Sequence, residues 1–287
     1  MITSAREYHE ENRLAWNEAT KAHNSHKGAQ ARFLREGGST LFPEEVELLD
    51  DIDGKRLLHL QCNAGQDTLS LAKLGAVCTG VDISDEAIAF ATQLSADTGI
   101  PATFVRSDVY DYLQQASIRG EQFDRVFSSY GAIGWLSDLK TWGNGIASLL
   151  APGGRFVLVE FHPLPNMFDE HMKLEWPYFG NGEVITSDEG IGDYVAYSGE
   201  GLVPWGYEEG VQDFKNPYRG HEFAWGVADA VMALVGAGLR LDSLLEYPYA
   251  NGCKRFEGAV EREGRRFYQP DGYPAMPGMY SVVATKG

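Results

Sequence analysis

Two aspartates in the first half of the chain each follow a short apolar segment, and their positions indicate a nucleoside site. Asp82 closes "AVCTGVD", 17 residues after Gly65, and Asp108 follows "ATFVRS". A carboxylate at the end of a second strand, about 20 residues after a glycine turn, accepts hydrogen bonds from ribose hydroxyls. Either aspartate could instead cap a helix or a turn.

The loop before Asp82 indicates which kind of nucleoside cofactor the site binds. It reads "HLQCNAGQDTLS" over residues 59–70, and Gly65 is its only glycine. A dinucleotide fold needs G-x-G-x-x-G, because the glycines let a pyrophosphate approach the backbone. Their absence disfavours a nicotinamide oxidoreductase, as does the lack of a Y-x-x-x-K pair at Tyr130 and Tyr178. A cofactor without phosphates, such as S-adenosylmethionine, has no pyrophosphate that must approach the backbone, so its loop needs fewer glycines.

Groups able to take a proton from a substrate occur further along the chain. His162 follows the apolar segment "RFVLVEF" and His221 ends a long polar stretch, so both are candidate bases. Tyr130 is a third catalytic candidate. Glu160 and Glu222 could orient a base or an amine.

The other histidines have simpler interpretations. His59 lies inside an apolar segment, which is typical of a hydrogen-bonded core residue. We expect His9, His26 and His171 to face solvent.

Hydrophobic periodicity predicts the elements that position these residues. Apolar segments of strand type lie at 56–60, 76–81, 102–107, 123–129 and 155–161. Helical patterns lie between them at 67–74, from Ser84 to near Gly99, and at 138–150, and "APGG" at 151–154 reads as a turn. Strands that alternate with helices predict a parallel sheet, with ligands at the carboxyl ends of the strands.

The alternation breaks over residues 163–224. This stretch holds 11 aromatic residues, and 12 acidic residues against 3 basic ones. A structureless loop of that length is uncommon in a compact domain, so we predict an inserted cap with short strands of its own. The α/β pattern then resumes with a helix at 225–239, the segment 240–249, and a final hairpin whose last strand is 279–285.

The cap composition predicts the kind of substrate. Aromatic faces bind flat aromatic groups or cations, and the acidic excess tolerates amines and repels anions. The predicted substrate-binding residues are Trp135, Tyr178, Phe179, Phe223 and Glu222.

The first helical segment has one informative face. Asn12, Trp16, Thr20 and His23 share a stripe at helical spacing. Two interpretations stand side by side: a helix that docks Trp16 into the core, or a lid over a cofactor and a substrate.

Composition limits the partners and the compartment. The net charge of −17 disfavours nucleic acid and anionic membranes. Cys62, Cys78 and Cys253 lack metal-ligand spacing, and an odd number suits a reduced cytosol. The first 20 residues lack the apolar core of a signal peptide, and no apolar run approaches ~20 residues. We expect a cytoplasmic protein that binds no metal, as a monomer or a homodimer.

These motifs, taken in order, resemble the bacterial S-adenosylmethionine-dependent methyltransferases of the Rossmann-like class, in particular their small-molecule branch of secondary metabolism. The segments are "HLQCNAGQDTLS", "GVDIS" (80–84), "SDVYD" (107–111) and "LLAPGGRFVLVEFHP" (149–163), with looser likeness in "NRLAWNEATKAH" (12–23) and over 221–286. The first loop of that class typically reads D-x-G-x-G-x-G. Here its positions carry His59, Gln61, Asn63 and Gly65.

The resemblance implies a fold and a cofactor site. The fold is a seven-stranded, mostly parallel sheet with helices on both faces. Asp108 would reach the adenine amine, and Ser129, Tyr130 and Gly131 would form a floor beneath the transferred methyl group. The implied cofactor-binding residues are Trp16, His23, Gln61, Asn63, Gly65, Asp82, Ile83, Ser107, Asp108, Val109 and Ser129.

The expected organisation has four parts: a lid helix region at 1–30, a cofactor-binding core at 31–162, the cap at 163–224 and the rest of the core at 225–287. The expected function is in-line methyl transfer to a small aromatic metabolite, indole- or phenol-like and tolerant of an amine. A nicotinamide-dependent oxidoreductase and a non-catalytic S-adenosylmethionine-binding protein are the alternatives.

Overall fold

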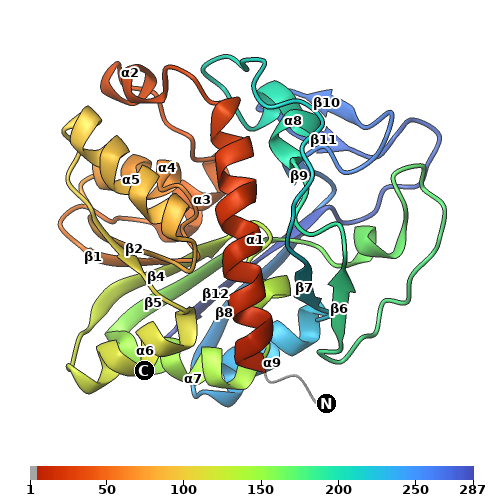
Figure 1. The fold of residues 1–287 in the computed structure, drawn as a ribbon. Helices are drawn as coiled ribbons and strands as arrows, with labels where there is room; N and C mark the ends of the chain where they lie inside the picture. Colours follow the sequence, from red (N-terminus) through yellow and green to blue (C-terminus); the bar gives the residue numbers. More distant parts are fainter. Residues whose placement is uncertain (1–4) are drawn as a thin grey trace.

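A seven-stranded sheet forms the centre of the computed structural model, which describes residues 5–287 (Figure 1). Its strands are β1 (Arg56–Leu60), β2 (Val77–Asp82), β3 (Thr103–Arg106), β4 (Phe123–Ser129), β5 (Leu150–Phe161), β8 (Arg240–Tyr247) and β12 (Met279–Thr285). Their order is β3-β2-β1-β4-β5-β12-β8, and only β12 runs antiparallel to its neighbours in this sheet. The predicted seven-stranded, mostly parallel sheet is confirmed.

Helices cover both faces of the sheet because its central strands β1, β4, β5 and β12 carry buried apolar side chains on both sides. The helices are α1 (Ala5–Ser25), α2 (Gln30–Arg35), α3 (Pro43–Leu49), α4 (Gln66–Lys73), α5 (Asp85–Thr98), α6 (Val109–Ile118), α7 (Leu139–Leu149), α8 (Tyr194–Ser198) and α9 (Val227–Gly236). Helices α6, α7 and α9 pack on one face, and α3 and α4 pack on the other. Helix α5 joins α2 and α4 in an adjoining apolar cluster.

Local sequence signals set the ends of several elements. Ser84 caps α5, its hydroxyl accepting a hydrogen bond from the Ala87 N–H at 3.1 Å, and Gly99 ends that helix in the left-handed conformation. The turn predicted at 151–154 is wrong, because these residues belong to β5. Their extra length is absorbed by a register shift against β4 between Phe123 and Arg125, as in a β-bulge.

The cap contains its own short elements, as predicted: η2 (Leu164–Met167), β6 (Val184–Ser187), α8, η3 (Gly199–Gly201) and β7 (Gly220–Phe223). Strands β6 and β7 pair antiparallel. The predicted final hairpin needs correction. Strands β8 and β12 do pair antiparallel, but residues 248–278 separate them and carry a second sheet of β9 (Ala250–Asn251), β10 (Val260–Arg262) and β11 (Arg266–Tyr268).

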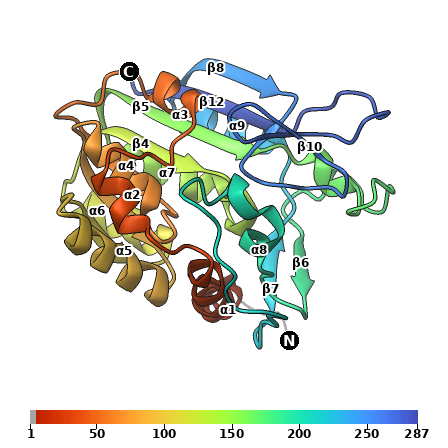
Figure 2. The same cartoon turned by 90° about the horizontal axis from the view of Figure 1, so that it is seen from above.

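Helix α1 packs against α5 and β7 (Figures 1 and 2). Its small residues Ala15 and Ala19 are fully buried against Ile191 of the cap. Lid region and cap are therefore packed together; residues 1–4 of the predicted lid region lie outside the described residues. No helix within 5–287 is long and apolar enough to cross a membrane.

Candidate functional site

The carboxyl ends of β1, β2, β4 and β5 border a cavity of about 1200 Å³, with α1 and the cap completing its wall. Most of the predicted site residues line this cavity: Trp16, Gln61, Asn63, Asp82, Ile83, Ser107, Asp108, Val109, Ser129, Tyr130, Trp135, His162, Tyr178, Phe179, Glu222 and Phe223. Three predicted residues, His23, Gly65 and His221, do not.

The loop after β1 keeps a glycine-type backbone with few glycines. Gln61, Asn63 and Gly65 all have positive φ, at 54°, 48° and 78°. The side chains of the two non-glycine residues make local bonds: Gln61 Nε2 donates to the Ala132 carbonyl at 2.8 Å, and Asn63 Oδ1 accepts from the Ala64 N–H at 2.7 Å. Hydrogen bonds thus hold the left-handed turns that glycine would otherwise allow freely.

Gly65 is required by packing and does not contact the cavity. A Cβ built on it would lie 2.6 Å from the Ala91 Cβ and 2.9 Å from the Phe104 ring. The predicted cofactor contact at Gly65 is therefore corrected: its missing side chain allows α4 to pack closely on α5 and β3.

Asp82 is fixed by backbone donors at the edge of the cavity. Its Oδ2 accepts from the Asn63 N–H at 2.8 Å and its Oδ1 from the Ser84 N–H at 2.9 Å. Burial raises the pKa of this carboxyl, and the backbone N–H groups partly offset that effect. Each oxygen keeps a second lone pair, so the carboxylate can still accept bonds from a diol.

Gln61 provides a test of whether the wall suits a nucleoside cofactor with an amino-acid tail. Its Oε1 is buried and has no hydrogen-bond partner within the described residues. An unsatisfied buried acceptor on a cavity wall calls for a donor from a bound group. With the Asp82 carboxylate beside the same loop, the residues fit S-adenosylmethionine, which carries ribose hydroxyls and an ammonium group.

Asp108 caps α6 and also contacts α1. Its Oδ1 accepts from the Tyr110 N–H at 2.8 Å, and its Oδ2 lies 2.7 Å from His9 Nδ1. Burial acts to raise the pKa of Asp108, but the hydrogen bond and charge of His9, the Tyr110 N–H and Arg6 together lower it. The expectation that His9 faces solvent is wrong, because it is buried between Asp108 and Ser137, whose Oγ lies 2.9 Å from its Nε2.

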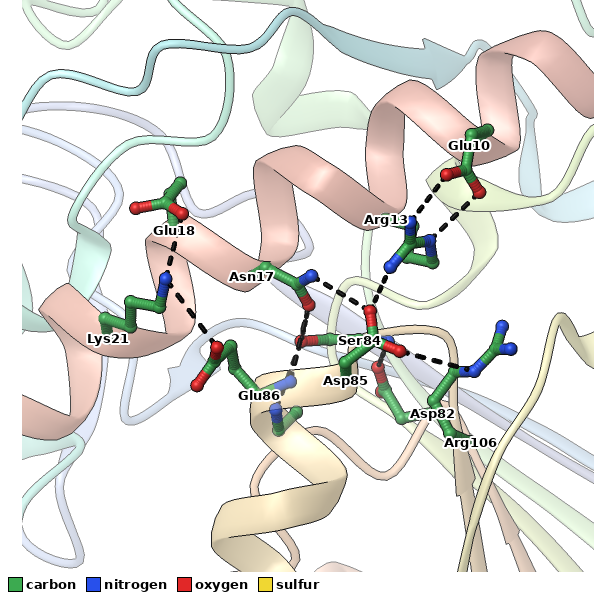
Figure 3. Close-up of polar contacts among 11 residues, drawn as sticks. Glu10, Arg13, Asn17, Glu18, Lys21, Asp82, Ser84, Asp85, Glu86 and Arg106 are labelled. Carbon is green, nitrogen blue, oxygen red and sulfur yellow. Dashed lines mark hydrogen bonds and ion pairs between the residues drawn. The ribbon is translucent and has the colours of Figure 1, made fainter.

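A polar network fastens α1 to the start of α5, next to Asp82 (Figure 3). Asn17 Oδ1 accepts from the Ser84 hydroxyl at 2.8 Å, and Asn17 Nδ2 donates to Asp85 at 3.0 Å. Arg13 also pairs with Asp85. Helix α1 is thus linked to Asp108 directly, through His9, and to Asp82 indirectly, through Asn17 and Ser84.

Glu160 shapes the turn that follows β4. Its carboxylate is buried and accepts N–H bonds from Gly131, from Ala132 at 2.7 Å and from Ile133 at 2.9 Å. Burial raises the pKa of Glu160, and these bonds act against that rise. The predicted interpretation that Glu160 orients a base is corrected, since its oxygens hold the backbone after Tyr130.

The candidate bases are already engaged in hydrogen bonds. His162 lines the cavity, but its Nδ1 accepts from the Leu164 N–H at 3.0 Å and its Nε2 lies 2.9 Å from Glu246. Burial lowers the pKa of His162. His221 lies off the cavity wall, because it faces α1 and pairs with Glu11 and Thr186.

Tyr130 lines the cavity with its backbone in the left-handed region, at φ 43°. Its hydroxyl accepts a hydrogen bond from Asn251 Nδ2 at 3.0 Å, and burial raises its pKa well above the ordinary value. A neutral phenol held in this way positions a ligand better than it removes a proton.

Histidines near the cap have structural partners. His23 is buried with its Nε2 3.0 Å from the Gly192 carbonyl, beneath the Tyr194 ring, which corrects its predicted cofactor contact. His26, expected in solvent, is fully buried and lies 2.8 Å from Asp193. His171 is exposed as expected.

Most of the aromatic residues of the cap line the cavity, and others pack within the fold. The cavity-lining residues are Trp176, Tyr178, Phe179, Tyr194, Tyr197, Trp205 and Phe223. Tyr207 stacks on His26 with ring centroids 5.0 Å apart, and Phe214 packs beside Ala15 and Ala19. Phe179 is 80% exposed and lies 5.0 Å from Tyr178 in an edge-on arrangement, so an apolar ring stands open on the cavity wall.

Sequence reasoning missed part of the wall. Lys27, Thr40, Asn251 and Arg265 line the cavity on the side of the β1 loop. Burial lowers the pKa of Lys27 to about 8, while Asp67 and Asp193 act to raise it. These residues come from segments without any recognisable motif, and only the fold brings them to the site.

The fold and the site together define a protein with a Rossmann-like sheet and one large cavity at the carboxyl edge of that sheet. Residues 57–154 match the family described as methyltransferase domain. The chain therefore carries a methyltransferase domain of the class that uses S-adenosylmethionine.

Individual proteins show the same likeness. A ubiquinone biosynthesis O-methyltransferase of Proteus mirabilis is 30% identical over 108 residues, covering 38% of this chain and 42% of that protein. An S-adenosyl-L-methionine-dependent Diels-Alderase of Talaromyces variabilis is 31% identical over 113 residues, covering 39% and 38%. Each match thus spans less than half of the relative's length.

A solved structure extends the likeness in fold to nearly the whole chain. The CcbJ methyltransferase from Streptomyces caelestis superposes with a TM-score of 0.56 at 14% identity, covering 96% of this chain and 99% of that one. At this identity the likeness concerns the fold alone.

Proposed function

We propose that this protein transfers the methyl group of S-adenosylmethionine to a small aromatic metabolite held beneath the cap. One observation carries the proposal: a single cavity of about 1200 Å³ joins Asp82 and Asp108 to the aromatic wall at Tyr178 and Phe179. This volume accommodates a nucleoside cofactor together with a compact acceptor.

Each of the wall residues would bind a different part of the cofactor. Asp82 would hold the ribose hydroxyls, Asp108 the adenine amine, and Gln61 Oε1 the ammonium group of the amino-acid tail. The bound cofactor supplies an electrophilic methyl group. The turn at Gly131, fixed by Glu160, and the aromatic cap orient the acceptor and exclude water, which supplies much of the rate in such displacements.

Neither of the two histidines predicted as bases is free, because both ring nitrogens of His162 and both of His221 already have hydrogen-bond partners. We therefore propose that positioning carries the reaction, and that neither His162 nor His221 acts as the general base.

The experiment is turnover of methyl-labelled S-adenosylmethionine against a panel of indoles and phenols, with the demethylated cofactor measured as product. Product measurement is decisive because two of the similar proteins are named S-adenosyl-L-methionine-dependent Diels-Alderases. We expect Asp82→Asn to weaken cofactor affinity by ~1–3 kcal/mol, through loss of charge-assisted hydrogen bonds. Asp97→Asn, on the exposed end of α5, is the control.

A thermal-shift comparison separates the other functions. Stabilisation by NAD(P) and not by S-adenosylmethionine would favour an oxidoreductase. Tight cofactor binding without transfer to any acceptor would favour a non-catalytic binding protein.

A further inference from the structure

Glu222 differs from Asp82, Asp108 and Glu160 because its side chain has no hydrogen bond or ion pair with any described residue. Asp82, Asp108 and Glu160 are each held by two or more donors. Glu222 lies on the cavity wall, and Arg255 is the one charged group with a resolved influence on it.

The strand geometry directs Glu222 into the cavity. On β7 the rings of His221 and Phe223 contact Tyr8 of α1, and successive strand residues point to opposite faces. Glu222 therefore faces away from α1, on the same side as its partner Ile185 of β6, which also lines the cavity. A Cβ placed on Gly134 would lie 3.9 Å from Glu222 Oε2, so the carboxylate reaches the turn that follows β4.

The surroundings leave this carboxylate short of a counter-charge. The cavity walls restrict the solvation of Glu222 and raise its pKa, and Arg255 acts in the opposite direction without forming an ion pair. The side chain is nevertheless exposed to the cavity, so its oxygens are free to accept charge-assisted hydrogen bonds from a cation with N–H donors. The aromatic side chains on the same wall, Trp135, Tyr178 and Phe179, also attract a cation through their ring faces.

We propose that Glu222 binds a protonated amine of the methyl acceptor, so that the substrate class is a small arylalkylamine. This inference rests on the proposed function and deepens it. A protonated nitrogen has no lone pair, so the anchored amine and the atom that accepts the methyl group are different atoms of the acceptor. Glu222 then acts as a specificity-determining residue.

The test uses matched pairs that differ in charge and little in shape: phenethylamine and 2-phenylethanol, tyramine and tyrosol, tryptamine and tryptophol. Each is titrated calorimetrically at pH 7 into the full chain saturated with S-adenosylhomocysteine. We expect at least one amine to bind roughly tenfold more tightly than its alcohol. Glu222→Gln should bring the two affinities together.

Glu183→Gln is the matched control. Glu183 also lines the cavity without a side-chain partner, but it immediately precedes β6 and does not lie on β7. We expect this variant to keep the preference for the amine. An equal loss in Glu183→Gln would mean that total charge, and not Glu222, sets the preference, and would overturn the proposal.

Other outcomes are equally clear. Equal affinities within every pair, or no detectable binding of any of the six probes, overturn the assignment. If Glu222→Gln lowers kcat for amines and alcohols alike with unchanged KM, the carboxylate serves the reacting atom and the assignment also fails. Binding of S-adenosylhomocysteine itself is read in the same titrations, so failure of the cofactor half of the proposed function is seen separately.

Discussion

Gln61, Asn63 and Gly65 share a left-handed backbone, and only the last is a glycine. A left-handed conformation costs an ordinary residue about 1–2 kcal/mol, and asparagine tolerates it better than most. The side-chain bonds of Gln61 to Ala132 and of Asn63 to Ala64 offset part of that cost. A cofactor loop can therefore keep its shape after losing glycines, provided that local donors and acceptors replace them.

Gly65 is the position in this loop where a side chain should not be accommodated. We expect Gly65→Ala to lower the free energy of unfolding by ~2–4 kcal/mol, through backbone strain plus collision with Ala91 and Phe104. The measurement is urea unfolding followed by circular dichroism.

Gly99→Ala is the control for backbone strain alone. Gly99 has φ 70°, and a Cβ there would meet nothing within 4 Å. We expect it to cost about 1 kcal/mol. If the two substitutions cost the same, the packing role assigned to Gly65 is wrong.

Residue-scale predictions from the sequence succeed where the determinants are local. Ser84 caps its helix and Asp82 closes its strand because both depend on neighbours within a few positions. The pairing of His9 with Asp108 joins residues 99 positions apart, and nothing near either residue signals it. The same holds for Lys27 and Arg265, which reach the cavity only through the folded chain.

At the scale of elements, α1 connects the two halves of the site. Through His9 and Asn17 it contacts Asp108, Ser84 and Asp85 on the cofactor side. Through Asn12 it bonds to the backbone of β7 on the cap side, with Nδ2 2.8 Å from the His221 carbonyl. We therefore predict that α1 acts as a lid, and that release of the cofactor involves opening of the α1–α5 contacts.

Loosening this contact should speed cofactor exchange. Asn17→Ala removes the bonds to Ser84 and Asp85, and we expect S-adenosylhomocysteine to dissociate roughly tenfold faster, with a smaller change in its association rate. Stopped-flow fluorescence measures both rates. Glu18→Ala, which removes an exposed ion pair to Lys21 of the same helix, is the control and should leave both rates near normal. Unchanged dissociation in Asn17→Ala would show that α1 does not gate the cofactor.

Helices and strands were predictable from the sequence where their hydrophobic pattern is regular. The stripe Leu139, Trp142, Ile146 and Leu149 predicted α7, and all four side chains are buried. The prediction of a turn at 151–154 was wrong because Pro and Gly residues, which are typical of turns, lie here in a bulged strand. The strands β8 and β12 pair across 31 intervening residues, a relation that no local pattern encodes.

For the whole molecule, buried histidines link stability to pH. Burial lowers the pKa of His59 to about 4, against an ordinary value of 6.5. The folded state therefore holds this ring neutral, while the unfolded chain binds a proton below pH 6.5. Stability from this group is full above pH 6.5 and falls as the pH drops towards 4, by at most ~1.4 kcal/mol per pH unit.

Urea unfolding of the wild type and His59→Gln at pH 7.0, 6.0, 5.0 and 4.5 measures this dependence. The raised pKa values of Asp82 and Glu160 act in the opposite sense over part of the range, so the difference between the two proteins is the quantity of interest. We expect His59→Gln to be less stable at pH 7, and the gap to narrow as the pH falls. A constant gap would show that folding does not change the pKa of His59.

The bond between Asn12 and His221 spans 209 positions of the chain. On a ribosome that adds about 5–20 residues per second, roughly 10–40 s pass between synthesis of the first helix and synthesis of its partner strand. Through that interval Ala15, Ala19 and Trp16 have no cap to cover them. Helix α1 can dock on α5 well before that, but a nascent chain that stops before residue 221 lacks β7, which holds the cap side of the helix.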